Sequence, residues 1–427
     1  MEISAERNPA GRVELIDALR GFAIFLMVLD HTRTFFFVLP YHPLDVTQSN
    51  PPAFFLRWVT HLAAPIFVFL TGISARLQRE RYDLSSYEFM RRQILRGFWL
   101  IFAEISWLHF IWTFRLNWEP VTLQVIFAIG CGLVVLGLLS RVSDRAILVA
   151  GVLILLLHNL TDFYSYNASI PWWWRLLHVY GEFRATGNVL VRVAYPVLPW
   201  IGLLLLGYGG AHELLRHKPA GPGSAMPSAW LFSGQLNYRS VILWGGIGFI
   251  LLLLRCSDPL SDMRELHATI HSVGPIQIMI RYGNFYIWQA HPEVGRTVMS
   301  FLNMCKYPPS LVFLLMCVFF TMPIVWLLAR YSGLGITRML ILVGRVPFFA
   351  YFVHLLLLHA LALVYFRLLG AGWQPDPHFY RDGMSSYSPP LLLLPLIASL
   401  FFHIIYILSR QYARYRSHMP AWMRLML

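Results

Sequence analysis

The sequence has few charged residues for its length. Of 427 residues, 13% are charged and 57% are hydrophobic, whereas an average soluble protein carries about 25% charged residues. A soluble globule of this size needs more polar surface, so that class is excluded, together with disordered chains, coiled coils and collagen. The composition instead predicts one all-α, polytopic membrane domain that covers residues 1–427.

Cysteine is scarce, and a cleavable signal peptide is not visible. The first apolar block already contains Asp17, Arg20 and Asp30, and no small-residue cleavage site follows it. The cysteines form no CxxC pair and no disulfide framework. A single disulfide between Cys256 and Cys305 is one alternative, although the sequence favours unpaired thiols. The four cysteines are Cys131, Cys256, Cys305 and Cys317.

The net charge of +13 is best explained by the orientation of the chain in a membrane. In a soluble protein it would suggest nucleic-acid binding, but here the basic residues lie mainly in short loops between apolar blocks. That pattern is typical of topology signals in membrane proteins. We therefore expect the lipid bilayer, and no nucleic acid, as a partner.

Apolar blocks of about 18–25 residues predict helices that cross a bilayer. The ninth is interrupted by Arg345 and Pro347, which predicts a tilted or broken helix. We expect about ten transmembrane helices, over residues 15–37, 52–75, 97–114, 121–139, 146–162, 189–208, 241–254, 311–328, 339–365 and 391–408.

The distribution of arginine and lysine predicts the orientation. The second loop holds six arginines, from Arg76 to Arg96, whereas the first loop has no basic residue. Even-numbered loops and both termini are therefore expected in the cytoplasm. Residues 219–234 predict a flexible cytoplasmic linker rich in Gly, Pro and Ser. Residues 255–310 predict a long extracytoplasmic loop with room for re-entrant or interfacial helices.

Titratable side chains inside spans are costly and therefore point to function. Measured from the outer end of its span, His31 lies about 9 Å deep and His61 about 13 Å deep. His42 follows in the first outer loop. Asp30, His31, Thr32 and Arg33 together interrupt an apolar run. We expect these groups to line a wet cavity in the outer half of the bundle.

Structural roles are the simpler interpretation for several other polar residues. Asp17 and Arg20 lie three residues apart on one helix face, which predicts an internal salt bridge, although their position also suits an anionic ligand. Residues 245–248 predict a packing face rather than a dinucleotide loop. A helix–helix hydrogen bond is the expected role of His109, His354, His359 and His403.

The histidines leave several chemistries open. Haem b needs facing histidine pairs, and no pattern selects them here. Zinc needs three or four ligands at one point, which His31, His61 and a carboxylate could supply. A proton-coupled small-molecule transporter would also place His and Asp within spans. Transporters usually have inverted repeats with broken helices, and this sequence has no internal repeat and one candidate break.

Several segments, in order along the chain, resemble the heparan-α-glucosaminide N-acetyltransferase catalytic-domain family, whose bacterial members were long a domain of unknown function. The first runs from Arg12 to His31 and begins RVELIDALRG. The family is also more loosely similar to other membrane acyltransferases, whose sequences begin with Asp-x-x-Arg-Gly and have a histidine in the first span. The later segments are Ala64–Gly72, Arg96–Leu100, Tyr195–Gly202, Phe301–Leu311 and Gly344–Pro347.

This resemblance implies transfer of an acetyl (acyl) group from cytosolic acetyl-CoA to an acceptor across the membrane. The lysosomal members acetylate the amine of a terminal glucosamine and use a histidine whose position resembles that of His42. They carry Asn where His31 stands and Asp where His61 stands. The base therefore stays open among His31, His42 and His61, and this chain is more similar to the bacterial members.

Acyl transfer needs a base for the attacking amine or hydroxyl and donors for the developing oxyanion. We expect His31 to be the base or a transient acyl carrier, with Asp30 or His61 orienting it. Arg33 or Asn159 would polarise the carbonyl. Arg20 and Arg345, with Asp17 beside them and the basic second loop, would bind the CoA phosphates.

The expected partners are acyl-CoA and an extracytoplasmic glycan or glycolipid acceptor, and no metal is predicted. A homodimer is compatible with the sequence. Compact loops without a targeting peptide favour a bacterial inner (plasma) membrane.

Overall fold

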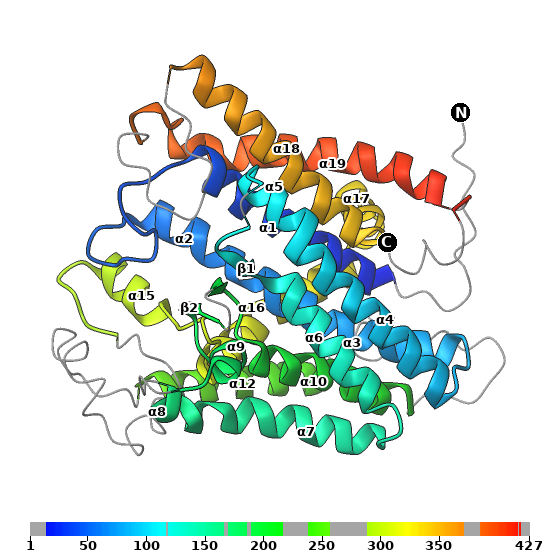
Figure 1. Cartoon of the computed structure of the whole chain (residues 1–427). Coiled ribbons are helices and arrows are strands. Elements are labelled where there is room, and N and C mark those ends of the chain that lie inside the picture. Colours follow the sequence, from blue (N-terminus) through cyan, green and yellow to red (C-terminus); the bar gives the residue numbers. More distant parts are fainter. Residues whose placement is uncertain are drawn as a thin grey trace.

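The computed structural model describes residues 14–116, 118–165, 170–185, 189–216, 238–256, 288–370, 385–416 and 418–419. The described chain is mostly helical (Figure 1). In chain order, its elements are α1 (Glu14–Phe36), α2 (Pro51–Val59), η1 (Thr60–Leu62), α3 (Ala63–Arg81), α4 (Ser86–Ala103), η2 (Glu104–Leu108), α5 (His109–Thr113), β1 (Val121–Leu123), α6 (Val125–Leu138), α7 (Asp144–Leu157), η3 (His158–Thr161), α8 (Asp162–Ser165), α9 (Trp172–His178), β2 (Gly181–Arg184), β3 (Leu190–Val193), α10 (Val197–Arg216), α12 (Tyr238–Cys256), α15 (Val294–Leu302), α16 (Leu311–Arg330), α17 (Gly335–Gly344), α18 (Pro347–Leu368), η5 (Ser385–Tyr387), η6 (Leu391–Leu393) and α19 (Leu394–Arg416).

Within the described residues, six helical segments are long and apolar enough to cross a membrane. Four shorter apolar helices accompany them, and each of the ten predicted spans contains at least one helix. Helix α1 is long enough but carries Asp17, Arg20, Asp30 and Arg33. The six long segments are Pro51–Arg81, Ser86–Thr113, Asp144–Thr161, Leu311–Arg330, Pro347–Leu368 and Leu391–Arg416.

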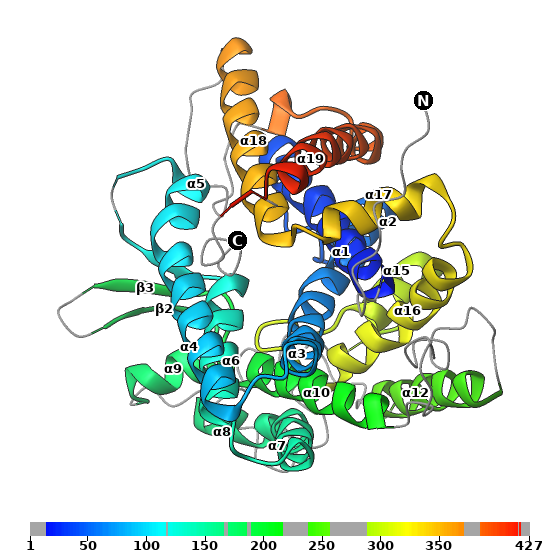
Figure 2. The same cartoon turned by 90° about the vertical axis from the view of Figure 1, so that its right-hand side faces the viewer.

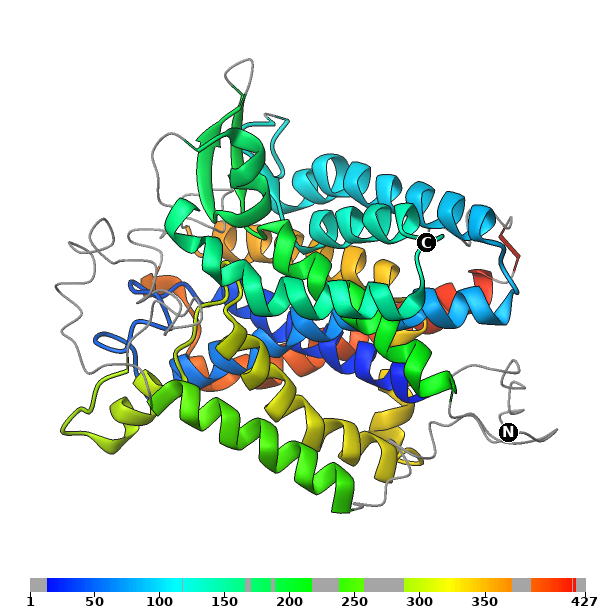
Figure 3. The ribbon, with the colours of Figure 1, turned by 90° about the horizontal axis from the view of Figure 1, so that it is seen from below.

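A small sheet corrects the all-α expectation. Its strand order is β1-β3-β2, with β1 parallel and β2 antiparallel to β3, so Val121 and Phe183 both face Val191. Two predicted spans, 121–139 and 189–208, therefore begin as strands. Hydropathy cannot separate a short apolar strand from the first turn of an apolar helix. The β2–β3 pair and α12 lie on opposite sides of the bundle (Figure 3, upper left and bottom).

Helix α1 lies inside the bundle, beside α3, α17, α18 and α19 (Figure 2). Its crossing with α17 is very close, because Gly21 faces the Leu340 carbonyl and Gly344 faces the Asp17 carbonyl. Small residues at such crossings let two helix backbones approach. The close fit fixes the depth of the α1 polar residues relative to α17 and α18.

The predicted helix break at Arg345–Pro347 is confirmed. Helix α17 ends at Gly344, and α18 begins at Pro347, where the missing N–H of proline costs no helical hydrogen bond. The two ends of the bundle differ in the elements that form them. We call the end with β1, β2, β3 and α15 the sheet end. The opposite end, where α1 begins and α19 finishes, is called the arginine end (Figure 1).

Other expectations have mixed outcomes. Gly248 packs on Phe319, but among the described residues no atom lies within 4 Å of a side chain added at Gly245 or Gly246, so the described chain supports the predicted packing face only at Gly248. All four cysteines are free. The predicted linker 219–234 lies outside the described residues. In the predicted loop 255–310, the described part contains α15, which Arg255 joins to α12 through three backbone carbonyls.

Candidate functional site

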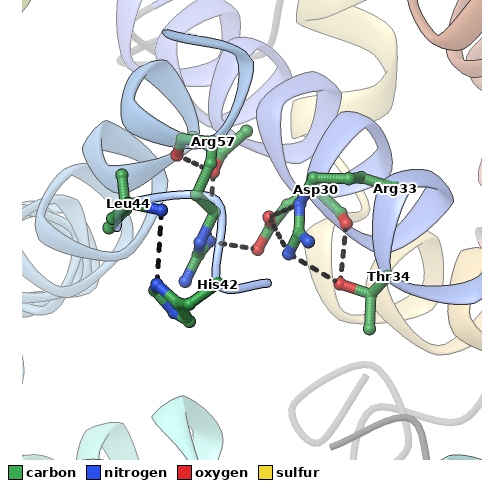
Figure 4. A network of polar contacts seen from close by, with 7 residues as sticks. Asp30, Arg33, Thr34, His42, Leu44 and Arg57 are labelled. Atoms are coloured by element: carbon green, nitrogen blue, oxygen red, sulfur yellow. Dashed lines mark hydrogen bonds and ion pairs between the residues drawn. The ribbon is translucent and has the colours of Figure 1, made fainter. Parts of the chain in front are cut away.

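The polar turn near the sheet end of α1 is organised around Asp30. Arg33, one turn later on α1, donates from Nε and Nη2 to Oδ1 at 3.3 and 3.2 Å. Arg57 of α2 donates from Nη1 to Oδ2 at 2.7 Å, so two arginines hold one carboxylate (Figure 4). Thr34 accepts from Arg33 and donates to the Asp30 carbonyl. Asp30 is therefore a counterion that fixes α1 to α2.

His31, the next residue on α1, bonds to His354 of α18. The His31 Nδ1 to His354 Nε2 distance is 2.7 Å, and the two rings are stacked. His354 Nδ1 lies 3.0 Å from the Ala350 carbonyl oxygen. Because a carbonyl only accepts, His354 Nδ1 carries its hydrogen and His354 Nε2 is an acceptor. His31 Nδ1 therefore donates, and the lone pair of His31 lies on Nε2.

This geometry corrects the expected orientation of His31. Asp30 or His61 was expected to hold the ring, but His354 holds it, and no other hydrogen bond to His31 occurs within the described residues. Asp30 is occupied by its two arginines. His61 lies in η1, buried, with its ring 5.7 Å from that of Phe313. Trp112 encloses His31 from α5, at 4.9 Å between ring centroids.

His42 lies in the loop between α1 and α2, where the sequence placed it. Its Nδ1 accepts the Leu44 backbone N–H at 3.2 Å, so the hydrogen of the neutral ring is on Nε2. Neither nitrogen then presents a lone pair to a substrate. Removal of water from the ring lowers the pKa of His42 to about 4, and the positive charges of Arg57 and Arg33 add to the effect.

Lys306 adds a third cation that the sequence reasoning missed. Its Nζ lies 5.1 Å from the ring centroid of Tyr307 and 5.7 Å from that of Tyr195, and it is close enough to act electrostatically on Asp30. Arg33, Arg57 and Lys306 thus bring three positive charges to Asp30. The region around Asp30 is electropositive, which suits an anionic or carbonyl-bearing ligand.

The arginine end gathers a second set of cations. The predicted salt bridge is present, with Arg20 Nη1 3.1 Å from Asp17 Oδ1, and Arg20 also bonds to Ser74 of α3. Arg345 at the α17–α18 break lies 3.7 Å from Glu14, and its carbonyl accepts from Arg416. Arg96 of α4 lies here within electrostatic reach of three other arginines, Arg20, Arg92 and Arg416.

Asn159 does not join either set. It lies in η3, where its Nδ2 donates to Asp162 and its Oδ1 accepts the Leu311 backbone N–H. These bonds are structural and fix η3 to the start of α16, so the expected role at a substrate carbonyl has no support in its contacts. Within the described residues, His31 and His61 do not combine with a third ligand as a metal centre would require.

Two other intramembrane groups have structural partners. Glu104 begins the π-helical turn η2, and its Oε2 accepts the Phe127 backbone N–H, so the carboxylate caps α6. His359 bonds to the Ile111 carbonyl at 2.6 Å, which is the helix–helix role predicted for it.

The family model described as heparan-alpha-glucosaminide N-acetyltransferase, catalytic, matches residues 12–236, more than half of the chain. The chain belongs to this N-acetyltransferase family. It is thus an integral membrane acetyltransferase. A search of curated proteins finds no match.

The residues that the family model matches include only some of the residues of the site. Residues of α1, α2 and α4 lie within it, including Asp30, His31 and Arg57. His354 and Lys306 lie beyond residue 236. The geometry therefore joins an N-terminal half that the family match covers to a C-terminal half that it does not.

Proposed function

We propose that this acetyltransferase moves an acetyl group from acetyl-CoA, bound from the cytosol at the arginine end, to an acceptor bound at the sheet end. His31 is the general base. The observation that carries this proposal is the hydrogen-bond chain from the Ala350 carbonyl through His354 to His31, which leaves the Nε2 lone pair of a partly exposed imidazole without another bond in the described chain.

The lone pair on His31 Nε2 suits one chemical step. An attacking amine or hydroxyl must lose a proton as it adds to the thioester carbonyl, and imidazole is a suitable acceptor near neutral pH. Such a base contributes on the order of 10² to 10⁴ in rate. Arg33 and Arg57 would stabilise negative charge on the carbonyl oxygen as it develops. In the alternative route, the same lone pair attacks the thioester carbonyl, the C–S bond breaks to release CoA as the thiolate, and the acetyl group then passes from His31 to the acceptor.

The spacing along α1 supports entry of CoA from the arginine end. Arg20 and His31 are eleven residues apart on one helix, which is roughly 16 Å along its axis. The pantetheine arm of CoA is roughly 15–20 Å long when extended. A molecule whose phosphates lie among Arg20, Arg96 and Arg416 would therefore place its thioester at the depth of His31.

The acceptor is proposed to be an amine or hydroxyl on a sugar-containing glycan or glycolipid outside the cytosol. The name of the family contains a glucosaminide, a sugar that presents both groups. The excess positive charge of Arg33, Arg57 and Lys306 around Asp30 supports an acceptor that carries an anionic group near the reacting atom.

Purified protein in detergent tests this function directly. Acetyl-CoA should raise the unfolding temperature, and acetyl transfer to methyl α-D-glucosaminide should be measurable by release of free CoA. His31→Gln should lower kcat by at least about 10². His403→Gln, at an exposed histidine of α19, is the matched control and should be normal. No stabilisation by millimolar acetyl-CoA would contradict the proposal.

Proton-coupled transport is the second candidate, and the broken α17–α18 pair favours it, because transporters often bind solutes where a helix is broken. Solute counterflow in proteoliposomes that contain no acyl-CoA would favour this function. Absence of counterflow combined with acetyl transfer would exclude it.

A further inference from the structure

A second polar cluster lies at the sheet end, away from His31. It is built by three short helices, η3, α8 and α9, which follow α7 (Figure 1). The side chains of His158, Asp162 and His178 are each no more than 3% exposed, and Ser165 is 7% exposed. Two imidazoles and a carboxylate buried together have a cost unless their hydrogen bonds are satisfied.

The partners of Ser165 fix the protonation of His178. The Ser165 hydroxyl donates to the Thr161 carbonyl at 3.2 Å and accepts from Trp174 Nε1 at 3.0 Å. Its one hydrogen is therefore used, and it can only accept from His178 Nδ1, which lies 3.1 Å away. Asp162 Oδ1 lies 3.5 Å from the same nitrogen. His178 Nδ1 therefore carries the hydrogen.

The assignment continues to His158. Since His178 Nδ1 carries the hydrogen, Nε2 of the neutral ring is an acceptor, and it lies 3.2 Å from His158 Nδ1. His158 Nδ1 then donates, which leaves the lone pair of His158 on Nε2. Within the part of the chain that the structure describes, that buried Nε2 has no hydrogen-bond partner.

The cluster is joined to the loop that carries Lys306. Asn159 bonds to the Leu311 backbone N–H, and the ring of Tyr180, two residues after His178, stacks on Tyr307 at 5.2 Å. Tyr307 is the neighbour of Lys306 in the electropositive region around Asp30. Asn159 and Tyr180 therefore hold the cluster against this loop, at the end of the bundle where the acceptor is proposed to bind.

We propose that His158 is an acceptor-binding residue whose Nε2 takes a hydrogen bond from a carbohydrate hydroxyl, and that Asp162, Ser165 and His178 are positioning residues that hold the lone pair there. The inference rests on the proposed function for the source of the hydroxyl. It assigns the sugar acceptor a contact with the η3–α8–α9 cluster, on a different element from those that carry His31 and His354.

Steady-state kinetics test the subsite. His158→Phe keeps a ring of similar size but removes the lone pair, so KM for methyl α-D-glucosaminide should rise about tenfold while KM for acetyl-CoA stays constant. His158→Gln, whose amide oxygen can accept, should recover part of the loss. His403→Phe is the control. An unchanged acceptor KM in a folded His158→Phe enzyme overturns the inference, whereas a wild-type enzyme without acetyl transfer overturns the proposed function.

A measurement on wild-type protein covers the case in which His158→Phe does not fold. In protein labelled with ¹⁵N-histidine, Nε2 of His158, assigned with His158→Gln, should have the chemical shift of an unprotonated imidazole nitrogen and should move when methyl α-D-glucosaminide is added. A protonated Nε2, or a shift that the sugar at saturating concentration leaves unchanged, contradicts the subsite.

Discussion

His354 determines which nitrogen of His31 is basic. With Leu at position 354, His31 Nδ1 loses its acceptor and the ring is free to take the other tautomer or to turn. We expect His354→Leu to lower kcat by about 10- to 100-fold, with KM for acetyl-CoA unchanged. His354→Gln, whose amide oxygen can accept from His31 Nδ1, should recover part of the rate. Equal losses in both variants would mean that His354 only fills space.

Asp30 is predicted to stabilise the protein rather than to act on substrate. Asp30→Asn leaves Arg33 and Arg57 without their carboxylate partner in a partly buried place, which should cost about 3 kcal/mol of unfolding free energy. Adding Arg57→Met should recover part of that loss, because one unpaired charge is removed. The unfolding temperatures of the two single variants and the double variant measure this coupling, and simple additivity would contradict it.

His42 should make stability depend on pH. The pKa in the folded protein, about 4, is below the unfolded value of about 6.5. Between these values the unfolded chain binds a proton that the folded protein does not, so the unfolding free energy falls as pH drops through this window. In His42→Gln, the unfolding temperature should fall less between pH 6.5 and 4. Identical pH profiles for wild type and variant would contradict this, with His403→Gln as the control.

Individual site residues could be recognised from the sequence more readily than the contacts between them. Asp30, His31 and Arg33 interrupt an apolar run and can be recognised without a structure. Arg57 also interrupts an apolar span, and that signal could have identified it. His354 and Lys306 could not have been paired with α1, because their contacts come from elements more than 270 residues away in the chain.

Among the elements, the crossing of α1 and α17 makes the clearest prediction. A methyl group at Gly344 would meet the Asp17 carbonyl backbone, which cannot move aside like a side chain. Gly344→Ala should therefore destabilise the protein by about 1–3 kcal/mol. Gly245→Ala is the matched control, because no atom of the described part of the chain lies within 4 Å of the new methyl group. Its unfolding temperature should equal or slightly exceed that of wild type. Equal losses in both variants would contradict the close crossing.

The elements themselves were largely predictable, since each apolar block contains a helix and the proline at 347 marks the start of α18. The sheet was not. Its strands are three or four residues long, and their partners are up to 70 positions apart, so no local pattern announces them. The role of Glu104 could not be predicted either, because only the tertiary structure shows that it caps α6.

In the whole molecule, the two ends of α1 lie beside the two proposed sites, one for CoA binding and one for acetyl transfer. The arginines near Arg20 suit CoA phosphates, and the groups around His31 suit the acetyl transfer, so one helix connects both halves of the proposed reaction. The described start of the chain at Glu14 and the end of α19 meet through Arg345 and Arg416 at the arginine end. The arginine and lysine distribution of the loops predicts that this end faces the cytoplasm.

Thiol labelling tests this orientation. In a Cys256→Ser background, which removes the exposed native thiol, Thr47→Cys marks the loop between α1 and α2, and Tyr87→Cys marks the first turn of α4. Both positions are exposed. A membrane-impermeant maleimide added to intact spheroplasts should label Thr47→Cys and should reach Tyr87→Cys only after lysis. The background variant without a reporter is the control. Because acetyl-CoA is a cytosolic metabolite too polar to cross lipid, the reverse pattern would put its proposed phosphate site on the wrong face of the membrane and contradict transfer across the bilayer.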